Sequence, residues 1–349
     1  MTTEKKMNIL AIESSCDETS AAVLAGDEVL SNIVSSQYFH GRFGGVVPEL
    51  ASRAHLKAIF AIVAEALSAA GVTMQDISAV AVTNKPGLVG SLIVGTNFAK
   101  GLALRYGLPI VPVNHIDGHI YSGCLQDNSV KFPFVALVVS GGHTVIFLVS
   151  SYNEYRVLGT TRDDAAGEAF DKVATLIGLD YPGGPLIDKY AREGNPKKYD
   201  FPRSMINSGN YEFSFSGLKT AVKYFLAKEF PNGVPTEALA DLCASVQSAI
   251  VDVLVSKVIA AALEHKVEHI VVGGGVSANS GLRAQLTAKA EKKRIKVILP
   301  AMGYCIDNAA MIGYVVQRKL SEADIYDFSD LSFRVNANTI RKKKRSELH

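Results

Sequence analysis

The stretch FVALVVSGGHTVIFLV, residues 134–149, joins two apolar runs through a short polar turn that holds two glycines. Runs rich in Val, Ile and Phe on both sides of such a turn predict a strand, a tight turn and a second strand. The earlier stretch MNILAIESSCDETSAAVL, residues 7–24, follows the same plan of apolar run, polar turn and apolar run. Two copies of one hairpin predict a duplicated architecture whose halves start near residues 7 and 133.

Strand and helix patterns alternate outside the two hairpins. Apolar residues recur at helical spacing over 48–70, and short apolar runs predict strands over 77–82 and 110–113. After the second hairpin we expect helices over 165–177, 238–263, 280–292 and 307–320, and strands over 269–272 and 295–299. This alternation is typical of an α/β protein with a central, largely parallel sheet.

The bulk composition restricts the class of protein. A chain of 349 residues suggests two lobes, and a net charge of +2 gives no basic field over the whole molecule. Any contact with nucleic acid must therefore come from a local patch. The basic run at 341–345 is either a solvated terminus or an arm that binds phosphates.

The cysteines and the apolar stretches indicate the compartment. Cys16, Cys124, Cys243 and Cys305 are widely spaced and form no CxxC pair, which favours reduced thiols in a cytoplasmic protein. The polar start of the chain lacks the long apolar region of a signal peptide, and no uninterrupted apolar stretch predicts a membrane span.

The sharpest local motif is VNHIDGH at 113–119, which places His115 and His119 four residues apart. On a helix these side chains share one face and can bind one cation. Two histidines satisfied by the core or the surface are the commoner outcome, but this pair follows a strand end, where open α/β sheets bind ligands. A zincin-type protease is disfavoured, since Ile116 stands where its catalytic glutamate would be.

Two glycine turns and several acids are further candidates. Backbone amides at 140–144 and 273–279 are able to bind a nucleotide, or the glycines simply permit tight turns. Neither turn has the dinucleotide or the P-loop pattern. Glu13, Asp17 and Glu18 are expected in the first hairpin turn, where they would bind a cation, act as a base or be solvated.

An ordered set of motifs resembles the universal tRNA threonylcarbamoyladenosine synthase family, in particular its bacterial catalytic subunit, formerly described as an O-sialoglycoprotein endopeptidase. The matching stretches run along nearly the whole chain: IESSCDET at 12–19, GGVVPE at 44–49, PGLVG at 86–90, NHIDGH at 114–119, VSGGHT at 139–144, AGEAFDK at 166–172, YPGGP at 181–185, FSFSGLKT at 213–220, GGVSAN at 274–279 and CIDNAA at 305–310.

The resemblance implies the duplicated actin/Hsp70/sugar-kinase-like (ASKHA) fold, with two lobes and a central cleft. The first lobe would comprise 7–132, completed by a C-terminal helix over 308–340. The second would comprise 133–307 with a surface insertion near 195–235, and a basic tail would follow at 341–349.

The resemblance also implies the site residues. One divalent metal per subunit, with Fe²⁺ as the expected ion and Zn²⁺ as the alternative, would be held by His115, His119 and Asp307. Asp17 or Glu18 is the candidate for accepting the proton of the attacking amine. The substrate-binding residues would be Val138, Val139, Ser140, Gly141, Gly142, Asp171, Gly184, Asp188 and Asn279.

The implied reaction is metal-dependent transfer of the threonylcarbamoyl group from threonylcarbamoyl-AMP to N6 of the adenosine beside the anticodon, in tRNAs that read codons beginning with A. The implied protein partners are a catalytically degenerate paralogue of the same fold and a small P-loop ATPase. The alternatives are an ATP-hydrolysing or phosphotransfer enzyme of the same fold and a nucleotide-binding scaffold.

The chain departs from the family pattern at three places. Asn84-Lys85 stands where small residues usually precede the Pro-Gly-Leu motif, Ile306 replaces the usual Thr beside Asp307, and Gly118 stands where Ala is common. The first puts the local loop shape in question, and the second removes a hydroxyl next to a metal ligand.

Overall fold

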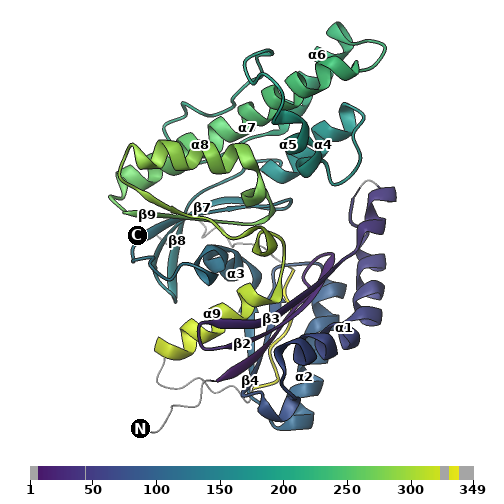
Figure 1. Cartoon of the computed structure of the whole chain (residues 1–349), viewed down its shortest axis with the longest axis vertical. Helices are drawn as coiled ribbons and strands as arrows, with labels where there is room; N and C mark the ends of the chain where they lie inside the picture. Colours follow the sequence, from purple (N-terminus) through teal and green to yellow (C-terminus); the bar gives the residue numbers. More distant parts are fainter. Residues whose placement is uncertain (1–6, 44, 323–329, 338–349) are drawn as a thin grey trace, which may run out of the picture. The chain divides into compact units, whose positions relative to one another are not determined.

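The computed structural model describes residues 7–43, 45–322 and 330–337 (Figure 1). The proposed basic tail at 341–349 lies outside these residues, as do parts of the proposed C-terminal helix segment. The chain divides into two compact units, residues 1–118 with 307–349, and residues 119–306. The boundary falls within the short helix α3 (His115–Tyr121).

The first unit is built on a five-stranded sheet of order β3-β2-β1-β4-β5. β1 pairs antiparallel with β2 and parallel with β4, and β4 pairs parallel with β5. The strands are β1 (Asn8–Glu13), β2 (Glu18–Ala25), β3 (Glu28–Ser36), β4 (Ala79–Lys85) and β5 (Ile110–Asn114).

The second unit has a sheet of the corresponding order, β10-β9-β6-β7-β8. Here β6 takes the place of β1, because it pairs antiparallel with β7 and parallel with β9. The strands are β6 (Phe134–Val139), β7 (Thr144–Ser151), β8 (Glu154–Thr160), β9 (His269–Gly273) and β10 (Lys296–Ile298). Two sheets of one topology confirm the duplication that the hairpins predicted.

The expectation of one largely parallel sheet was wrong. Each sheet is mixed, because each hairpin contributes two antiparallel strands and a further antiparallel strand follows it at the edge. These edge strands, β3 and β8, carry few buried side chains. They therefore lack the apolar run that identifies a central strand in a sequence, and they were not predicted.

Three helices cover the sheet of the first unit: α1 (Pro48–Ala70), α2 (Val89–Tyr106) and α9 (Ala309–Glu322). Leu10 and Ile12 of β1 belong to the core that α1 and α2 complete. Ala11 points to the opposite face, where α9 approaches so closely that a Cβ on Gly313 would lie 3.2 Å from the Ala11 side chain. The sheet is therefore buried on both faces.

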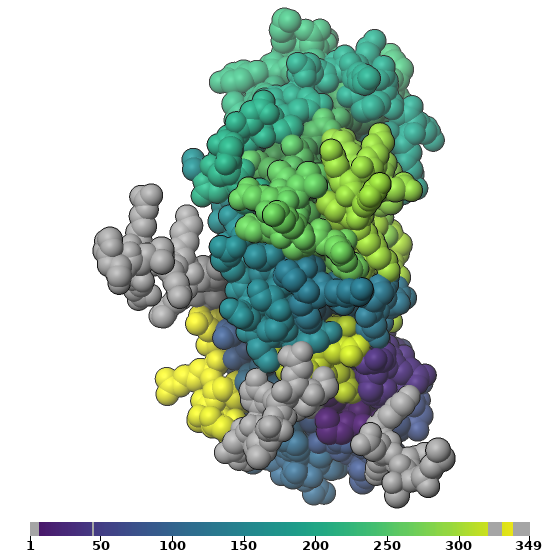
Figure 2. All heavy atoms as spheres, turned by 90° about the vertical axis from the view of Figure 1, so that its left-hand side faces the viewer, coloured from purple at the N-terminus to yellow at the C-terminus, as the bar shows by residue number. Residues whose placement is uncertain are grey.

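Five helices belong wholly to the second unit: α4 (Ala166–Leu176), α5 (Gly183–Ala191), α6 (Ser216–Glu229), α7 (Thr236–Glu264) and α8 (Ser280–Glu291). By length and composition α7 is able to span a bilayer, but 72% of its most apolar window is buried, as in a core helix. In α8 only Leu282, Leu286 and Ala290 are buried, and its yellow-green atoms form part of the surface in Figure 2.

Two helices, α5 and α6, were not expected from the sequence patterns. α6 falls inside the expected insertion at 195–235, where Leu218 and Val222 are buried one turn apart. The carboxylate of Asp163 accepts hydrogen bonds from the backbone N–H groups of Phe215 and Ser216 at the start of α6. α5 begins at Gly183, inside the YPGGP motif at 181–185. Both helices start at contacts with residues distant in the sequence, which local patterns do not reveal.

Candidate metal centre and nucleotide-binding loops

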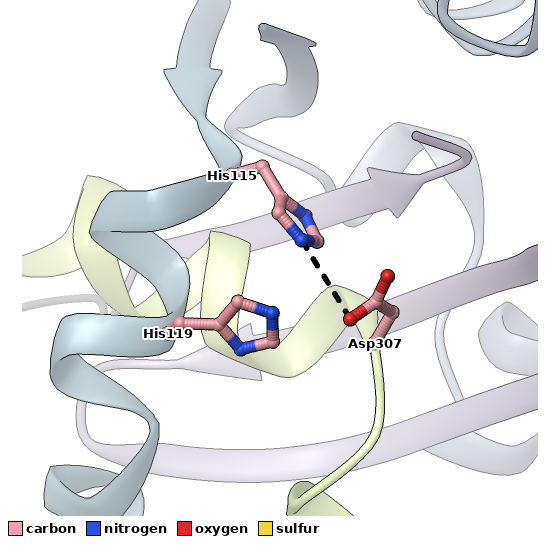
Figure 3. A group of neighbouring side chains, drawn as sticks. All are labelled: His115, His119 and Asp307. Atoms are coloured by element: carbon pink, nitrogen blue, oxygen red, sulfur yellow. Dashed lines mark ion pairs between the residues drawn. The ribbon is translucent and has the colours of Figure 1, made fainter. Parts of the chain in front are cut away.

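His115, His119 and Asp307 come together at the carboxyl edge of the first sheet (Figure 3). Both histidines lie on α3, one turn apart, directly after β5. Asp307 lies just before α9, and its Oδ1 is 3.6 Å from Nε2 of His115. One donor atom from each residue lies within 4.8 Å of the others. Two imidazoles and one carboxylate in this arrangement suit a non-haem Fe²⁺ or Zn²⁺.

The packing of α3 accounts for one departure from the family pattern. A Cβ added to Gly118 would lie 2.9 Å from Cγ of Met311 and 3.0 Å from Cδ1 of Ile312 on α9. Glycine at this position lets α3 lie close against α9, the helix that follows Asp307. The substitution of the common alanine is thus compatible with a compact metal centre.

Another departure has a local role of its own. The side-chain amide of Asn84, at the end of β4, donates to the carbonyl oxygen of Arg334 at 3.3 Å. The carbonyl oxygen of Asn84 accepts from the N–H of Asn336 at 3.0 Å. Asn84 thereby fixes the described C-terminal segment 330–337 against the first unit.

Glu13 was expected in the polar turn, but it is the last residue of β1 and fully buried. Its Oε2 lies 3.0 Å from Nδ1 of His115 and accepts the Thr83 hydroxyl at 2.5 Å. Burial lowers the pKa of His115. The negative charges of Asp307 and Glu13 raise it by more, and the resulting pKa is about 9. The sequence did not predict this contact between Glu13 and His115. The feature that could have indicated it is the position of Glu13 at the end of a buried strand, which lies beside β4.

Asp17 lies in the first turn, as expected, whereas Glu18 is the first residue of β2. Burial, Asp307 and Asp17 raise the pKa of Glu18 to about 10. Glu18 is therefore protonated at neutral pH unless a cation lies close to it. The turn itself is held by His55 of α1, whose Nε2 lies 2.8 Å from the Cys16 carbonyl oxygen and whose Nδ1 lies 2.8 Å from the Thr19 hydroxyl.

The corresponding turn of the second unit, 140–143, follows Val138 and Val139, which are buried at the end of β6. Ser140 closes the turn, because its N–H donates to the His143 carbonyl oxygen at 2.8 Å. At Gly141 and Gly142 an added Cβ would meet nothing within 4 Å, so their backbone is open to a ligand. A Cβ added to Gly274, by contrast, would lie 2.4 Å from the Val139 carbonyl oxygen, so Gly274 packs directly against the strand end before the turn.

The remaining candidates join the helices around this turn. Oδ1 of Asp171 on α4 accepts from the N–H groups of Gly183 at 2.8 Å and Gly184 at 3.2 Å. Burial raises the pKa of Asp171, whereas these two hydrogen bonds lower it, and the net shift is upward. Asp171 and Gly184, both implied as substrate-binding residues by the resemblance, are thus hydrogen-bonded to each other.

Asp188 and Asn279 meet at the start of α8. Asp188 on α5 accepts from the N–H and the hydroxyl of Ser280. Asn279 caps the helix by accepting from the Leu282 N–H at 2.9 Å, and it donates to Oε1 of Gln247 at 2.7 Å. The second unit thus gathers all nine of the predicted substrate-binding residues.

The two sheets of equal topology define the class of protein: the duplicated actin-like ATPase fold. The chain resembles the nucleotide-bound crystal structure of full-length HypF (TM-score 0.60, 13% identity, 92% of this chain and 48% of that one). It also resembles the Acidaminococcus fermentans (R)-2-hydroxyglutaryl-CoA dehydratase component A (TM-score 0.55, 14% identity, 90% and 100%). At such identities the likeness extends to the fold alone.

Sequence similarity then defines the family. The family model of tRNA N6-adenosine threonylcarbamoyltransferase matches residues 28–314. A tRNA N6-adenosine threonylcarbamoyltransferase of Clostridium botulinum (strain 657 / Type Ba4) is 54% identical over 312 residues, which cover 89% of this chain and 92% of the relative. The chain belongs to the tRNA N6-adenosine threonylcarbamoyltransferase family.

Proposed function

We propose that this protein transfers the threonylcarbamoyl group of threonylcarbamoyl-AMP to N6 of the adenosine beside the anticodon, in tRNAs that read codons beginning with A. The observation that carries the proposal is the family match over residues 28–314. We further propose that the reaction depends on one divalent metal ion, Fe²⁺ before Zn²⁺, held by His115, His119 and Asp307. The grouping of these three donors around one point supports it.

Each group of residues has a proposed part in binding. Ser140, Gly141 and Gly142 surround the phosphate of the adenylate with backbone amides, in a turn with no side-chain bulk at its two glycines. Asp171, Gly184, Asp188 and Asn279 orient the adenosine moiety, and Val138 and Val139 support the turn. When bound, the metal ion supplies a Lewis acid that neutralises negative charge developing on the substrate oxygens.

The transfer itself is an acyl substitution at the carbamoyl carbon. The adenine N6 amine forms the new C–N bond, the bond to the phosphate oxygen breaks, and AMP leaves. Asp17 or Glu18 accepts the proton that the amine loses; a nearby cation would lower the raised pKa of Glu18, which is the direction that this role requires. The target adenosine lies in a single-stranded loop, so its base is extruded from the stack at modest cost.

We also propose the setting of the reaction. A catalytically degenerate paralogue of the same fold and a small P-loop ATPase assemble with this chain in the cytoplasm, where its tRNA substrate is found. The family resemblance supports these partners.

The decisive experiment supplies the substrates directly. The purified chain and its two partners are incubated with threonylcarbamoyl-AMP and unmodified tRNA, and the nucleosides are analysed by mass spectrometry. We expect threonylcarbamoyladenosine in tRNAs that read codons beginning with A, and none in tRNAs that read other codons. ATP hydrolysis by the chain alone, together with no tRNA modification in the complete mixture, would contradict the proposal and favour a phosphotransfer enzyme.

A further inference from the structure

Glu13 is a fully buried carboxylate that lies outside the proposed group of metal ligands. It ends β1, Thr83 lies in the parallel strand β4, and His115 follows β5, the next parallel strand. The carboxyl ends of three adjacent strands therefore bring these side chains together. A carboxylate in such a place is costly unless its oxygens are paired.

The hydrogen bonds of Glu13 use both carboxylate oxygens. Oε1 accepts from the N–H of Ser15 at 2.5 Å. Oε2 accepts the Thr83 hydroxyl and faces Nδ1 of His115. One oxygen thus accepts from a backbone N–H and the other from a hydroxyl, an arrangement that favours the ionised carboxyl. An ionised carboxylate only accepts hydrogen bonds.

The consequence for His115 concerns its two ring nitrogens. An imidazole that binds a metal ion carries only one proton, and since Glu13 accepts, that proton belongs on Nδ1, which lies 3.0 Å from Oε2. The hydroxyl of Ser15 also lies 3.1 Å from Nδ1, but a carboxylate is the stronger acceptor. The lone pair is then on Nε2, the nitrogen that lies 3.6 Å from Oδ1 of Asp307.

We propose that Glu13 is a positioning residue that holds His115 in the Nδ1–H form and aims its Nε2 at the cation. The proposal rests on the metal site proposed above. Carboxylates that accept from a ligating histidine raise its basicity and fix its ring, and their loss typically weakens metal binding by roughly 10–100-fold. Glu13 acts through His115, so the main effect of its removal at this site should be a loss of metal affinity.

The first test reads the protonation of His115 in the intact protein. Protein with ¹⁵N-labelled histidine is loaded with Zn²⁺, which is diamagnetic, and long-range ¹H–¹⁵N correlation spectra are recorded. We expect His115 to carry its proton on Nδ1 and to bind zinc through Nε2. A proton on Nε2, or zinc on Nδ1, would overturn the proposal. Because the experiment uses the unaltered protein, its result does not depend on whether a variant folds.

The second test measures Co²⁺ affinity by titration of the visible absorption bands. Glu13→Gln keeps the size of the side chain but sets an amide NH₂ against either Ser15 or His115, and we expect roughly 10–100-fold weaker binding. Thr83→Val is the matched control, since it removes another hydrogen bond from the same carboxylate without touching His115. We expect nearly unchanged Co²⁺ affinity in this control, even where its thermal stability falls.

His115→Ala separates the two proposals. If His115→Ala loses Co²⁺ binding while folded Glu13→Gln binds as tightly as the unaltered protein, the positioning role is wrong and the metal site stands. If His115→Ala binds Co²⁺ unchanged, the metal site fails and the role of Glu13 fails with it. Equal weakening in Thr83→Val and Glu13→Gln would reduce Glu13 to a structural residue.

Discussion

The Asp188 carboxylate accepts two hydrogen bonds from one residue, Ser280: Oδ1 lies 2.9 Å from its backbone N–H and 2.6 Å from its hydroxyl. Ser280 is the first residue of α8 and directly follows Asn279. One contact therefore joins α5 to the start of α8 and aligns two of the proposed substrate-binding residues. One oxygen of Asp188 is committed to this contact before any substrate binds.

Removal of the Ser280 hydroxyl should therefore weaken substrate binding without touching a proposed ligand. We expect Ser280→Ala to cost about 1 kcal/mol of stability and to raise KM for threonylcarbamoyl-AMP several-fold, with a smaller change in kcat. Steady-state kinetics and thermal unfolding measure both effects. Thr287→Ala, at an exposed position of the same helix, is the control, and an unchanged KM in Ser280→Ala would contradict the argument.

Loss of a proposed metal ligand should remove both the ion and the activity. We expect His119→Ala and Asp307→Asn to be purified without stoichiometric metal and to modify tRNA at least about 100-fold more slowly, since an open site with two ligands binds divalent ions weakly. Elemental analysis and nucleoside analysis provide the two measurements. His265→Ala, a histidine outside the cluster, should retain both; full activity of metal-depleted Asp307→Asn would refute metal dependence.

Sequence patterns predicted the duplicated fold because each hairpin repeats one periodicity, an apolar run on either side of a polar turn. They also predicted the pair His115 and His119, because four residues on a helix define one face. Asp307 followed only from the family resemblance, since no local pattern joins it to α3. Contacts that depend on strand order, such as Glu13 with His115, required the three-dimensional structure.

The same reasoning explains what was missed. The first N–H groups of α5 and α6 are satisfied by Asp171, on α4, and by Asp163, in the loop before α4. Their sequences begin with glycine or serine and predict a turn when read alone. β3 and β8 are edge strands with one buried residue each. In each case long-range hydrogen bonding decides the structure, and local propensity carries little of that information.

The raised pKa of Glu18 makes the stability of chelator-treated protein depend on pH. The carboxyl has a pKa of about 10 in the folded protein and an ordinary value of 4.5, so folding favours its protonated form. Its contribution is fully present below 4.5 and is lost as the pH rises towards 10. Glu18→Gln, which cannot ionise, should therefore raise Tm by about 2–4 °C near pH 8 and by less near pH 5.

Thermal unfolding with a chelator present tests this expectation. Glu154→Gln removes an exposed glutamate and is the control for net charge. If the Tm difference between Glu18→Gln and the unaltered protein were the same at both pH values, Glu18 would be an ordinary ionised carboxylate. It could then accept the amine proton without a cation to lower its pKa.

The glycine pair at 274 and 275 offers a test of how the proposed phosphate-binding turn at 140–142 is held. Gly274 has φ of 89°, and an added Cβ would lie 2.4 Å from the Val139 carbonyl oxygen, directly before Ser140. Gly274→Ala should cost about 2 kcal/mol or more and displace the turn, so KM for threonylcarbamoyl-AMP should rise more than ~10-fold. At Gly275 the added atom meets nothing within 4 Å, so Gly275→Ala should leave stability nearly unchanged. Thermal unfolding and steady-state kinetics of both variants, measured side by side, check this contrast. Equal losses of stability and of substrate affinity would show that the backbone freedom of the whole glycine run, and not the contact with Val139, determines the shape of the turn.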